Sequence, residues 1–266
     1  MSLAIIGHGK MGRLIEQLAP EYGFAVTARL NSTNNRDTSG ITGNNFAGVD
    51  VAVDFSTAAA APQNIARLAA LQINTVVGTT GWTQQLPQVQ ARVRDSGIGL
   101  VWSPNYSVGV NIFLQLASEA SRRIASYKEY GAWAWEIHHA AKKDAPSGTL
   151  LKVVDEMQRA DPSREVSISS NRAGAHPGTH EIGFDSAADS LTIRHTARSR
   201  EGFARGALLA ARWVAGKQGW FEFRDVLFAQ DSAPGALNRK GGASAPPSSA
   251  EKQGALAPEA ELLDRG

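Results

Sequence analysis

Apolar runs alternate with helical patterns along the first part of the chain. Strand-like runs read LAII, FAVTARL, VDVAVDF, NTVVGTT and IGLVWS, and segments with helical periodicity separate them, such as Met11 to Leu18 and Pro62 to Leu71. Strands that alternate with helices are typical of βαβ units, in which the strands form a parallel sheet. This part of the chain therefore predicts an α/β domain.

The order of the elements changes after residue 107. We expect helices near Asn111 to Ser126 and Thr149 to Arg159, with a strand over AWAWEIHH between them. Strand-like runs follow at EVSISS, HEIGF and SLTIRHT, and FARGALLAARWVAG then has the periodicity of an amphipathic helix. These elements predict a second, α+β unit, followed by a helix that can pack back on the first domain.

The composition is that of an ordinary globular protein, with 42% hydrophobic and 20% charged residues. The 27 Lys and Arg residues are scattered among 25 Asp and Glu residues, which disfavours nucleic-acid binding. Cysteine is absent from the sequence, which excludes disulfides and thiolate chemistry. The N-terminus lacks the features of a signal peptide, and no run approaches the ~18 apolar residues of a membrane span. We therefore expect a cytoplasmic protein that binds neither nucleic acid nor membrane.

A glycine-rich turn follows the first strand. LAIIGHGKMGRLIEQLA places Gly7, Gly9 and Gly12 in G-x-G-x-x-G spacing between an apolar strand and a helical pattern. Such glycines permit a tight turn, and the helix N-terminus offers free N–H groups to a pyrophosphate. This context favours dinucleotide binding over a purely structural turn.

The residue that selects the cofactor is expected about twenty positions further on, at the end of the second strand. There the sequence reads ARLNSTNNR, with Asn31 at the strand end and no acidic residue beside it. An NAD-selective site usually supplies Asp or Glu to the ribose, whereas a 2′-phosphate suits neutral donors and a cation such as Arg29 or Arg36. We expect NADPH to serve at least as well as NADH; the alternative is that Arg29 is a solvated strand residue.

Two further loops, GTTGW and SPNYS, lie at expected strand ends. An open α/β sheet binds its ligands at this edge. We expect the backbone at Gly78 and Thr80 to line the nicotinamide ribose, and Asn105 or Tyr106 to flank the ring. Turn chemistry alone is the alternative.

The stretch EIHHAAKKDAPSGT joins a strand to a helix. Because a strand alternates faces, Glu136 and His138 point one way and Trp133 and Trp135 the other. A lone histidine is more often structural than catalytic. A histidine pair at a strand end, followed by Lys142 and a helix N-terminus, favours a functional site.

The helix that follows has a candidate anion site at its start. Ser147 is expected to cap it, and Gly148 leaves N–H groups open to a ligand. Capped helices commonly bind nothing, but Lys142 and Lys143 lie just upstream and favour a carboxylate site. A histidine, with an ordinary pKa near ~6.5, suits general acid catalysis. Together these features indicate a reductase that acts on a small carboxylate.

The same stretch resembles the E-x-H-H-x-x-K-x-D-A-P-S-G-T signature of the dihydrodipicolinate reductase family, which acts in the bacterial diaminopimelate and lysine pathway. Supporting motifs occur in the family's order: GHGKMG, VAVDFS, VVGTTGW, SPNYSVGVN, LTIRHTARSREGFARGALLAARW and FEFRDVL. The resemblance implies that NADPH or NADH gives hydride to C4 of a dicarboxylate ring imine, and that the resulting enamine is protonated at C3.

The resemblance also implies roles for individual positions. His138 matches the proton donor, and Lys142 matches the catalytic lysine. The groups that hold the substrate carboxylates match His139, Ser147, Gly148 and Thr149. The dinucleotide contacts match Gly7, His8, Gly9, Lys10, Met11, Gly12, Asn31, Gly78, Thr79, Thr80, Ser103, Pro104, Asn105 and Tyr106. Asn31 stands where many members carry an acidic residue, and no metal is expected.

The predicted fold is a Rossmann-type dinucleotide-binding domain with an inserted α+β domain for substrate binding and oligomerisation. The first comprises residues 1–107 plus 200–230, and the second residues 108–199. The resemblance implies a homotetramer assembled through the second domain's sheet. Residues 231–266 are rich in Ala, Gly, Pro and Ser and are predicted to be a disordered tail.

Two alternative functions remain open at this point. Another NAD(P)-linked carboxylate reductase, such as an aspartate-dehydrogenase-like enzyme, shares the glycine turn but need not carry the sequence HHxxKxDAPSGT. A non-catalytic dinucleotide sensor shares the first domain but has no use for the histidine, lysine and anion site.

Overall fold

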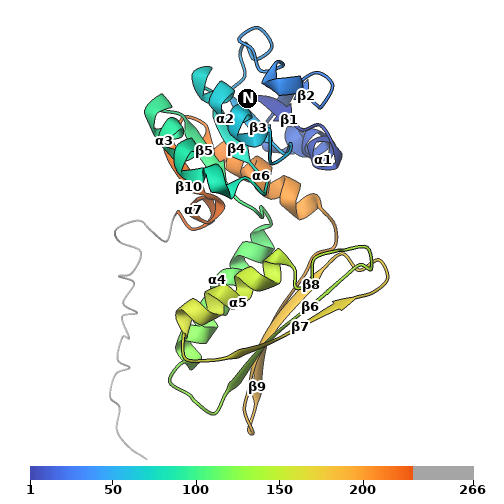
Figure 1. Cartoon of the computed structure of the whole chain (residues 1–266), viewed down its shortest axis with the longest axis vertical. Coiled ribbons are helices and arrows are strands. Elements are labelled where there is room, and N and C mark those ends of the chain that lie inside the picture. Colours follow the sequence, from blue (N-terminus) through green and yellow to red (C-terminus); the bar gives the residue numbers. More distant parts are fainter. Residues whose placement is uncertain (230–266) are drawn as a thin grey trace, which may run out of the picture. The chain divides into compact units, whose positions relative to one another are not determined.

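The first of two sheets is built mainly from the short apolar strands of the N-terminal part. The computed structural model describes residues 1–229, so the tail predicted at 231–266 lies outside the described residues. The strands of this sheet are β1 (Ser2–Ile6), β2 (Ala25–Leu30), β3 (Val51–Asp54), β4 (Asn74–Val77), β5 (Gly99–Trp102) and β10 (Gly219–Glu222). They lie in the order β10-β5-β4-β3-β1-β2, and all neighbours are parallel (Figure 1). The predicted Rossmann-like parallel sheet is confirmed.

Helices cover both faces of this sheet. They are α1 (Lys10–Leu18), α2 (Ala61–Ala70), α3 (Leu86–Ser96), α6 (Glu201–Val214) and α7 (Phe223–Leu227), with short 3-10 helices η1 (Ala19–Tyr22), η2 (Arg36–Thr38) and η3 (Thr83–Gln85). Leu3 and Ile5 of β1 pack with α1 and α6, whereas Ala4 and Ile6 pack on the other face with Leu68 of α2. A strand covered on both faces is apolar at every position, which explains the run LAII.

The chain changes direction across this sheet at β1. Strand β2 lies on one side of β1, and the next strand in the sequence, β3, lies on the other side. Open α/β sheets bind ligands outside the carboxyl ends of the strands at such a point. The loops that follow β1, β3 and β4 therefore meet where a dinucleotide is expected.

The second sheet has four strands. They are β6 (Gly131–His138), β7 (Val166–Arg172), β8 (Thr179–Asp185) and β9 (Ser190–Thr196). Their order is β7-β6-β8-β9, with β6 and β7 parallel and the other pairs antiparallel. Helices α4 (Val108–Ile124) and α5 (Gly148–Ala160) lie side by side and pack on one face of this sheet (Figure 1). The predicted second α+β unit is therefore present.

Strand β6 alternates between a covered and a more open face. Ala132, Ala134, Glu136 and His138 are buried, and the residues between them are partly exposed. The buried side is the one that packs on α4 and α5. The predicted alternation is confirmed, and it directs Glu136 and His138 to the helices.

Two of the helices begin where a serine caps them. Helix α4 begins at Val108 rather than near Asn111, because the Ser107 hydroxyl accepts a hydrogen bond from the Val110 N–H at 3.3 Å. The predicted cap of α5 is confirmed, since the Ser147 hydroxyl accepts from the Leu150 N–H at 3.2 Å.

Residues Met1–Ala229 form one compact unit that contains both sheets. The predicted boundaries at residues 107 and 200 therefore stay predictions. Within this unit, none of the helices has the length and apolar character needed to cross a membrane.

Candidate active site

The turn after β1 requires glycine at two of the predicted positions. Gly7 has φ +89°, and a Cβ there would lie 2.3 Å from the Phe55 carbonyl oxygen. A Cβ on Gly12 would lie 2.6 Å from the Gly7 carbonyl oxygen. Gly9, in contrast, has open space at its Cβ position, and helix α1 begins just after it without a side-chain cap. The turn thus leaves the first N–H groups of α1 available to an anion.

A cavity of about 530 Å³ lies beside this turn. Of the predicted dinucleotide contacts, those that line it are Gly7, Gly9, Lys10, Met11, Gly78, Thr79 and Thr80. Phe55, Ser56, Ala58 and Arg200 complete the lining. Among these described residues the charged ones, Lys10 and Arg200, are both cationic, which suits a pyrophosphate. The glycine contacts and the charge therefore fit a bound dinucleotide.

The carboxylate of Glu16 lies next to Arg29, one of the residues expected to select the cofactor. Glu16 of α1 forms an ion pair with Arg29 (2.5 Å) and a hydrogen bond with Nε2 of His8 (2.6 Å). These bonds, that of His8 first, lower the pKa of Glu16. The Asn31 side-chain oxygen accepts from the backbone N–H of Thr33 at 2.8 Å. Arg29 is therefore an exposed strand residue whose guanidinium pairs with Glu16. That NADPH serves at least as well as NADH stays a prediction.

A buried carboxylate supports the floor of this cavity. Asp54, at the end of β3, is fully buried, and its Oδ1 accepts from the Ser56 N–H and the Thr79 hydroxyl, both at 2.8 Å. Its Oδ2 accepts from Asn64 at 2.9 Å. Burial raises the pKa of Asp54 against the opposing effect of these hydrogen bonds. Because the Thr79 hydroxyl donates its hydrogen bond to Asp54, we expect Thr79 to contact a cofactor through its backbone.

The side chain of Tyr106 lies in the core and lines neither of the two described cavities. Its side chain is 2% exposed, and its hydroxyl lies 3.0 Å from the Val77 carbonyl oxygen and 2.9 Å from that of Val101. The ring also packs against Phe223, with 5.0 Å between centroids. Burial raises the pKa of Tyr106. The prediction for this side chain is wrong, because it ties β4 to β5 inside the core.

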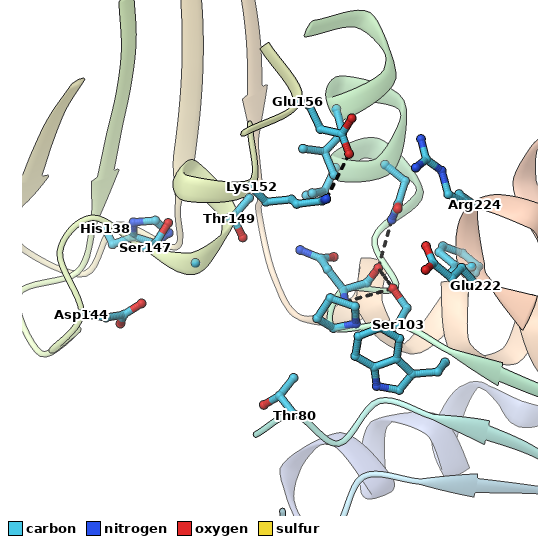
Figure 2. A pocket seen from close by; sticks show the side chains of 18 of the residues that line it. Thr80, Ser103, His138, Asp144, Ser147, Thr149, Lys152, Glu156, Glu222 and Arg224 are labelled. Carbon is cyan, nitrogen blue, oxygen red and sulfur yellow. Dashed lines mark hydrogen bonds and ion pairs between the residues drawn. The ribbon is translucent and has the colours of Figure 1, made fainter. Parts of the chain in front are cut away.

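A second cavity, of about 490 Å³, brings most of the other predicted residues together (Figure 2). The predicted residues that line it are Thr80, Ser103, Pro104, Asn105, His138, Lys142, Ser147, Gly148 and Thr149. Thr80 and Ser103 reach it from loops of the first sheet, and His138 and Thr149 from the second unit. Thr80 lines both cavities, so the cofactor cavity meets the histidine site there.

His138 is the last residue of β6 and is 8% exposed. Its Nδ1 lies 3.4 Å from Glu136 Oε2, and a Cβ on Gly178 would lie 2.9 Å from its ring. Burial lowers the pKa of His138, Glu136 opposes this shift, and Lys142 adds to it. The imidazole of the free protein is therefore held towards its neutral form.

Lys142 lies in the same cavity, with Nζ 2.8 Å from Asp144 Oδ1. This hydrogen bond is the main cause of the lowered pKa of Asp144. Among the described residues, the cavity lining includes His138 but not His139. The structure thus leaves the predicted contact between His139 and substrate without geometric support, whereas Lys142 lies where its charge can act.

The N-terminus of α5 opens into the cavity at Gly148 and Thr149. Ser147, in contrast, is 2% exposed and donates both its N–H (2.8 Å) and its hydroxyl to the carboxylate of Glu136. Its hydrogen-bond donors are therefore engaged inside the protein. The Gly148 N–H interacts with the Asp144 carboxylate and contributes to its lowered pKa, whereas Thr149 retains groups that can bind a substrate carboxylate.

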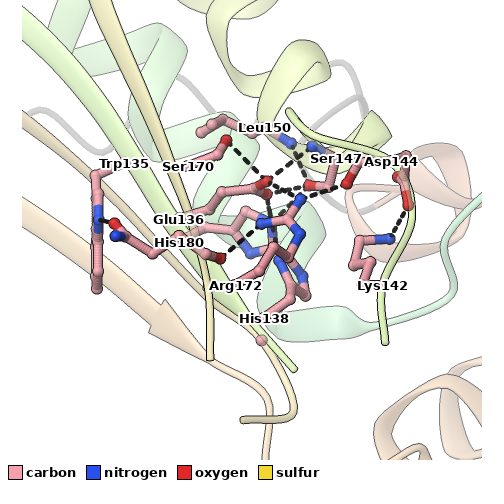
Figure 3. Close-up of polar contacts among 12 residues, drawn as sticks. Trp135, Glu136, His138, Lys142, Asp144, Ser147, Leu150, Ser170, Arg172 and His180 are labelled. Atoms are coloured by element: carbon pink, nitrogen blue, oxygen red, sulfur yellow. Dashed lines mark hydrogen bonds and ion pairs between the residues drawn. The ribbon is translucent and has the colours of Figure 1, made fainter. Parts of the chain in front are cut away.

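Sequence reasoning placed Glu136 on the His138 face but missed the network around it (Figure 3). Besides Ser147, the carboxylate of Glu136 accepts from Arg172 Nη2 at 2.8 Å and from the Ser170 hydroxyl at 3.1 Å. Burial alone would raise the pKa of Glu136, but the hydrogen bonds from Ser147, Arg172 and Ser170 outweigh it and lower the pKa to about 2. Glu136 is therefore ionised at neutral pH.

Glu136, His138 and His180 could ligate a metal by their residue types, since one donor atom from each lies within 4.8 Å of the others. The chemistry of their surroundings disfavours this. Arg172 already forms an ion pair with Glu136, and Ser147 donates to both carboxylate oxygens. A divalent cation would have to break these bonds next to a permanent positive charge. We interpret the cluster as a hydrogen-bonding network.

The protein combines a Rossmann-like sheet and its glycine turn with a second cavity that contains a histidine, a lysine and a helix N-terminus. The two cavities meet at Thr80. These features define a nicotinamide-dependent oxidoreductase of anionic substrates. Family models narrow this class. Residues 1–106 match the N-terminal part and residues 109–227 the C-terminal part of dihydrodipicolinate reductase. The chain therefore belongs to the dihydrodipicolinate reductase family, as the motifs predicted.

Individual relatives agree with the family match. A 4-hydroxy-tetrahydrodipicolinate reductase of Christiangramia forsetii is 32% identical over 240 residues, which cover 85% of this chain and 98% of the relative. A reductase of the same name from Methanoregula boonei is 39% identical over 196 residues, 67% of this chain and 74% of the relative. Among solved structures, dipicolinate-bound dihydrodipicolinate reductase from Paenisporosarcina sp. TG-14 has a TM-score of 0.71 at 21% identity, covering 84% of this chain and 97% of that one. At this level of identity, the similarity to the solved structure supports the fold alone.

Proposed function

We propose that the protein is an NAD(P)H-dependent 4-hydroxy-tetrahydrodipicolinate reductase that forms tetrahydrodipicolinate in lysine and diaminopimelate biosynthesis. The observation that carries this proposal is that Thr80 lines both the cofactor cavity and the cavity of His138. Family membership and the relatives' names agree with it. The bound cofactor supplies a hydride to C4 of the ring imine.

His138 then gives a proton to C3 of the enamine. Its Nδ1 lies beside Glu136, so we assign the proton transfer to Nε2. A protonated imidazole is needed for this step, although burial lowers the pKa of His138 in the free protein. A bound dicarboxylate brings negative charge that raises this pKa, so that substrate binding itself favours the acid form.

The substrate carboxylates are held by Lys142 and by the start of α5. Gly148 and Thr149 line the cavity at the start of this helix. A helix N-terminus and an ammonium group both favour an anion. Ser147 contributes by fixing this turn through Glu136, rather than by direct contact with substrate.

We further propose that the protein is a cytoplasmic homotetramer assembled through the open face of the second sheet. Trp133 and Trp135 on this face of β6 are half-buried and lie away from α4 and α5. Light scattering combined with size-exclusion chromatography measures the number of subunits. A monomer at micromolar concentration would contradict this assignment.

A coupled assay tests the function directly. Dihydrodipicolinate synthase, pyruvate and aspartate semialdehyde generate the substrate, and loss of absorbance at the reduced-nicotinamide band reports turnover with NADPH or NADH. We expect oxidation of cofactor that requires all components. If cofactor binds but is not oxidised, the protein is instead a reductase of another substrate or a non-catalytic dinucleotide sensor.

A further inference from the structure

Both parts of the proposed site connect to one carboxylate outside the cavity. Glu136 is fully buried near the end of β6 and, among the described residues, does not line the cavity. The polar groups that surround its two oxygens are the Ser147 N–H and hydroxyl, Arg172 Nη2, the Ser170 hydroxyl, His180 Nε2 and His138 Nδ1. A buried carboxylate needs such partners.

The first connection leads from Glu136 to the anion-binding turn. Ser147 gives both of its donors to Glu136, while its hydroxyl oxygen caps α5 by accepting from Leu150. The next two residues of the chain, Gly148 and Thr149, present their groups to the cavity. The position of Glu136 therefore fixes the position of the turn that binds the carboxylates.

The second connection leads from Glu136 to the acid. Oε2 of Glu136 lies 3.4 Å from His138 Nδ1 and 3.3 Å from His180 Nε2, and the two rings lie edge to face with centroids 5.0 Å apart. Nδ1 of His138 is buried and has no hydrogen-bond partner within the described structure. A small rotation of the imidazole would bring this N–H within hydrogen-bond distance of Glu136, in a ring that lines the cavity.

We propose that Glu136 is a positioning residue that couples the proton donor to the carboxylate-binding turn, because one carboxylate binds Ser147 and lies 3.4 Å from Nδ1 of His138. The assignment rests on the proposed function. A substrate carboxylate that binds at the start of α5 shifts Ser147, and through Ser147 it affects Glu136, the group that orients the His138 imidazole. Binding of the dicarboxylate and alignment of the acid are thus linked through Glu136.

The charge of Glu136 also affects when His138 is protonated. The charged or titratable groups that face His138, from β6, the loop after it, β7 and β8, are Glu136, Lys142, Asp144, Arg172 and His180. Of these, Glu136 and Asp144 raise the pKa of His138, whereas Lys142 and Arg172 lower it. Loss of the Glu136 charge therefore lowers the pKa of His138.

The test is Glu136→Gln, which keeps the size of the side chain but removes its charge. We expect kcat to fall about tenfold or more, since a positioned acid contributes roughly 10²–10⁴-fold to a rate. The pH at which kcat declines on the alkaline side should move lower, because the acid form of His138 is lost at a lower pH. KM for substrate should rise as the turn at Gly148 loosens.

Asp161→Asn is the matched control. Asp161 is 4% exposed and pairs with Arg164 at 2.9 Å, just beyond the other end of α5. This variant should lower the melting temperature but leave the pH profile unchanged. If Glu136→Gln behaves in the same way, Glu136 is only structural and the proposal is overturned. Should Glu136→Gln not fold, Glu136→Asp keeps the charge but shortens its reach, and wild-type kcat and KM in that variant would overturn the proposal equally.

An NMR titration of the imidazole separates this inference from the proposed function. In the protein without substrate, the pKa of His138 should be lower in Glu136→Gln than in the wild type, whatever reaction the protein catalyses. An unchanged pKa refutes the coupling. A lowered pKa in a protein that shows no turnover of the proposed substrate refutes the function and leaves the coupling in place.

Discussion

The same substitution at the two glycines of the cofactor turn should weaken cofactor binding in both cases but reduce stability in only one. Gly7→Ala adds a methyl group where the backbone and Phe55 leave no room, whereas Gly9→Ala adds it where nothing lies within 4 Å. The first change disturbs the protein itself. The second intrudes only on the space assigned to the pyrophosphate, and so tests that assignment.

The cost of Gly7→Ala has two parts. An alanine at φ +89° is strained by about 1–2 kcal/mol. Its Cβ would also lie 2.3 Å from the Phe55 carbonyl oxygen, and the shift that relieves this overlap costs about 1–3 kcal/mol. The sum, about 2–5 kcal/mol, corresponds to a fall in melting temperature of about 4–20 °C for a chain of this size. For Gly9→Ala, the lower helix-capping preference of alanine and the entropy lost from the unfolded chain nearly cancel, within about 1 kcal/mol.

Thermal unfolding and cofactor titration distinguish the two variants. Gly7→Ala should lose stability and bind NADPH weakly. Gly9→Ala should melt within a few degrees of the wild type but bind NADPH at least about tenfold more weakly, a loss of ~1.4 kcal/mol. Wild-type affinity in Gly9→Ala would show that the pyrophosphate does not lie over this turn, and the cofactor assignment would fall with it.

Three further substitutions test individual roles in the site. His138→Gln should lower kcat by about 10²–10⁴-fold with little effect on KM, as steady-state kinetics would show, since an acid acts in the transition state; an unchanged kcat rejects that role. Lys142→Ala should reduce both turnover and inhibition by pyridine-2,6-dicarboxylate, and unaltered inhibition would remove Lys142 from the anion site. Glu16→Gln releases Arg29 and should raise the ratio of kcat/KM for NADPH to that for NADH about two- to fivefold, because an exposed ion pair is worth up to ~1 kcal/mol. An equal ratio in both proteins would exclude Arg29 from cofactor selection.

The elements that the sequence predicted well are those with strong periodicity. Strand β1 is continuously apolar because helices cover both of its faces, and α6 carries a wide buried stripe. Helix α3 gave little signal, since only Val89 and Val93 are buried among many polar residues. Strand β10 is a four-residue edge strand that pairs only with β5 among the described strands. Such elements depend on tertiary contacts that local periodicity does not encode.

Within the site, sequence patterns identified the residues whose positions depend on their own strand or helix. Alternation along β6 placed Glu136 with His138, and the preference of serine for helix N-termini identified Ser147. Arg172 and His180 had no comparable signal, because their places beside Glu136 follow from the register of β7 and β8 against β6. Tyr106 was misassigned for a related reason. Its motif placed the loop correctly, but which loop side chains turn inward depends on the packing between β4 and β5.

Each of the two cavities lies beside a fully buried carboxylate that holds the adjoining loop in place by hydrogen bonds. Asp54 accepts from the Ser56 backbone and from Thr79 beneath the cofactor cavity, and Glu136 accepts from Ser147 beneath the substrate cavity. They differ in their partners. The donors to Asp54 are neutral and do not outweigh burial, so its pKa is raised, whereas the hydrogen bonds to Glu136, which include one from a cation, lower its pKa to about 2. Glu136 is thus more firmly ionised than Asp54, and its negative charge lies 3.4 Å from His138 Nδ1, where it stabilises the protonated imidazole that the proposed chemistry requires.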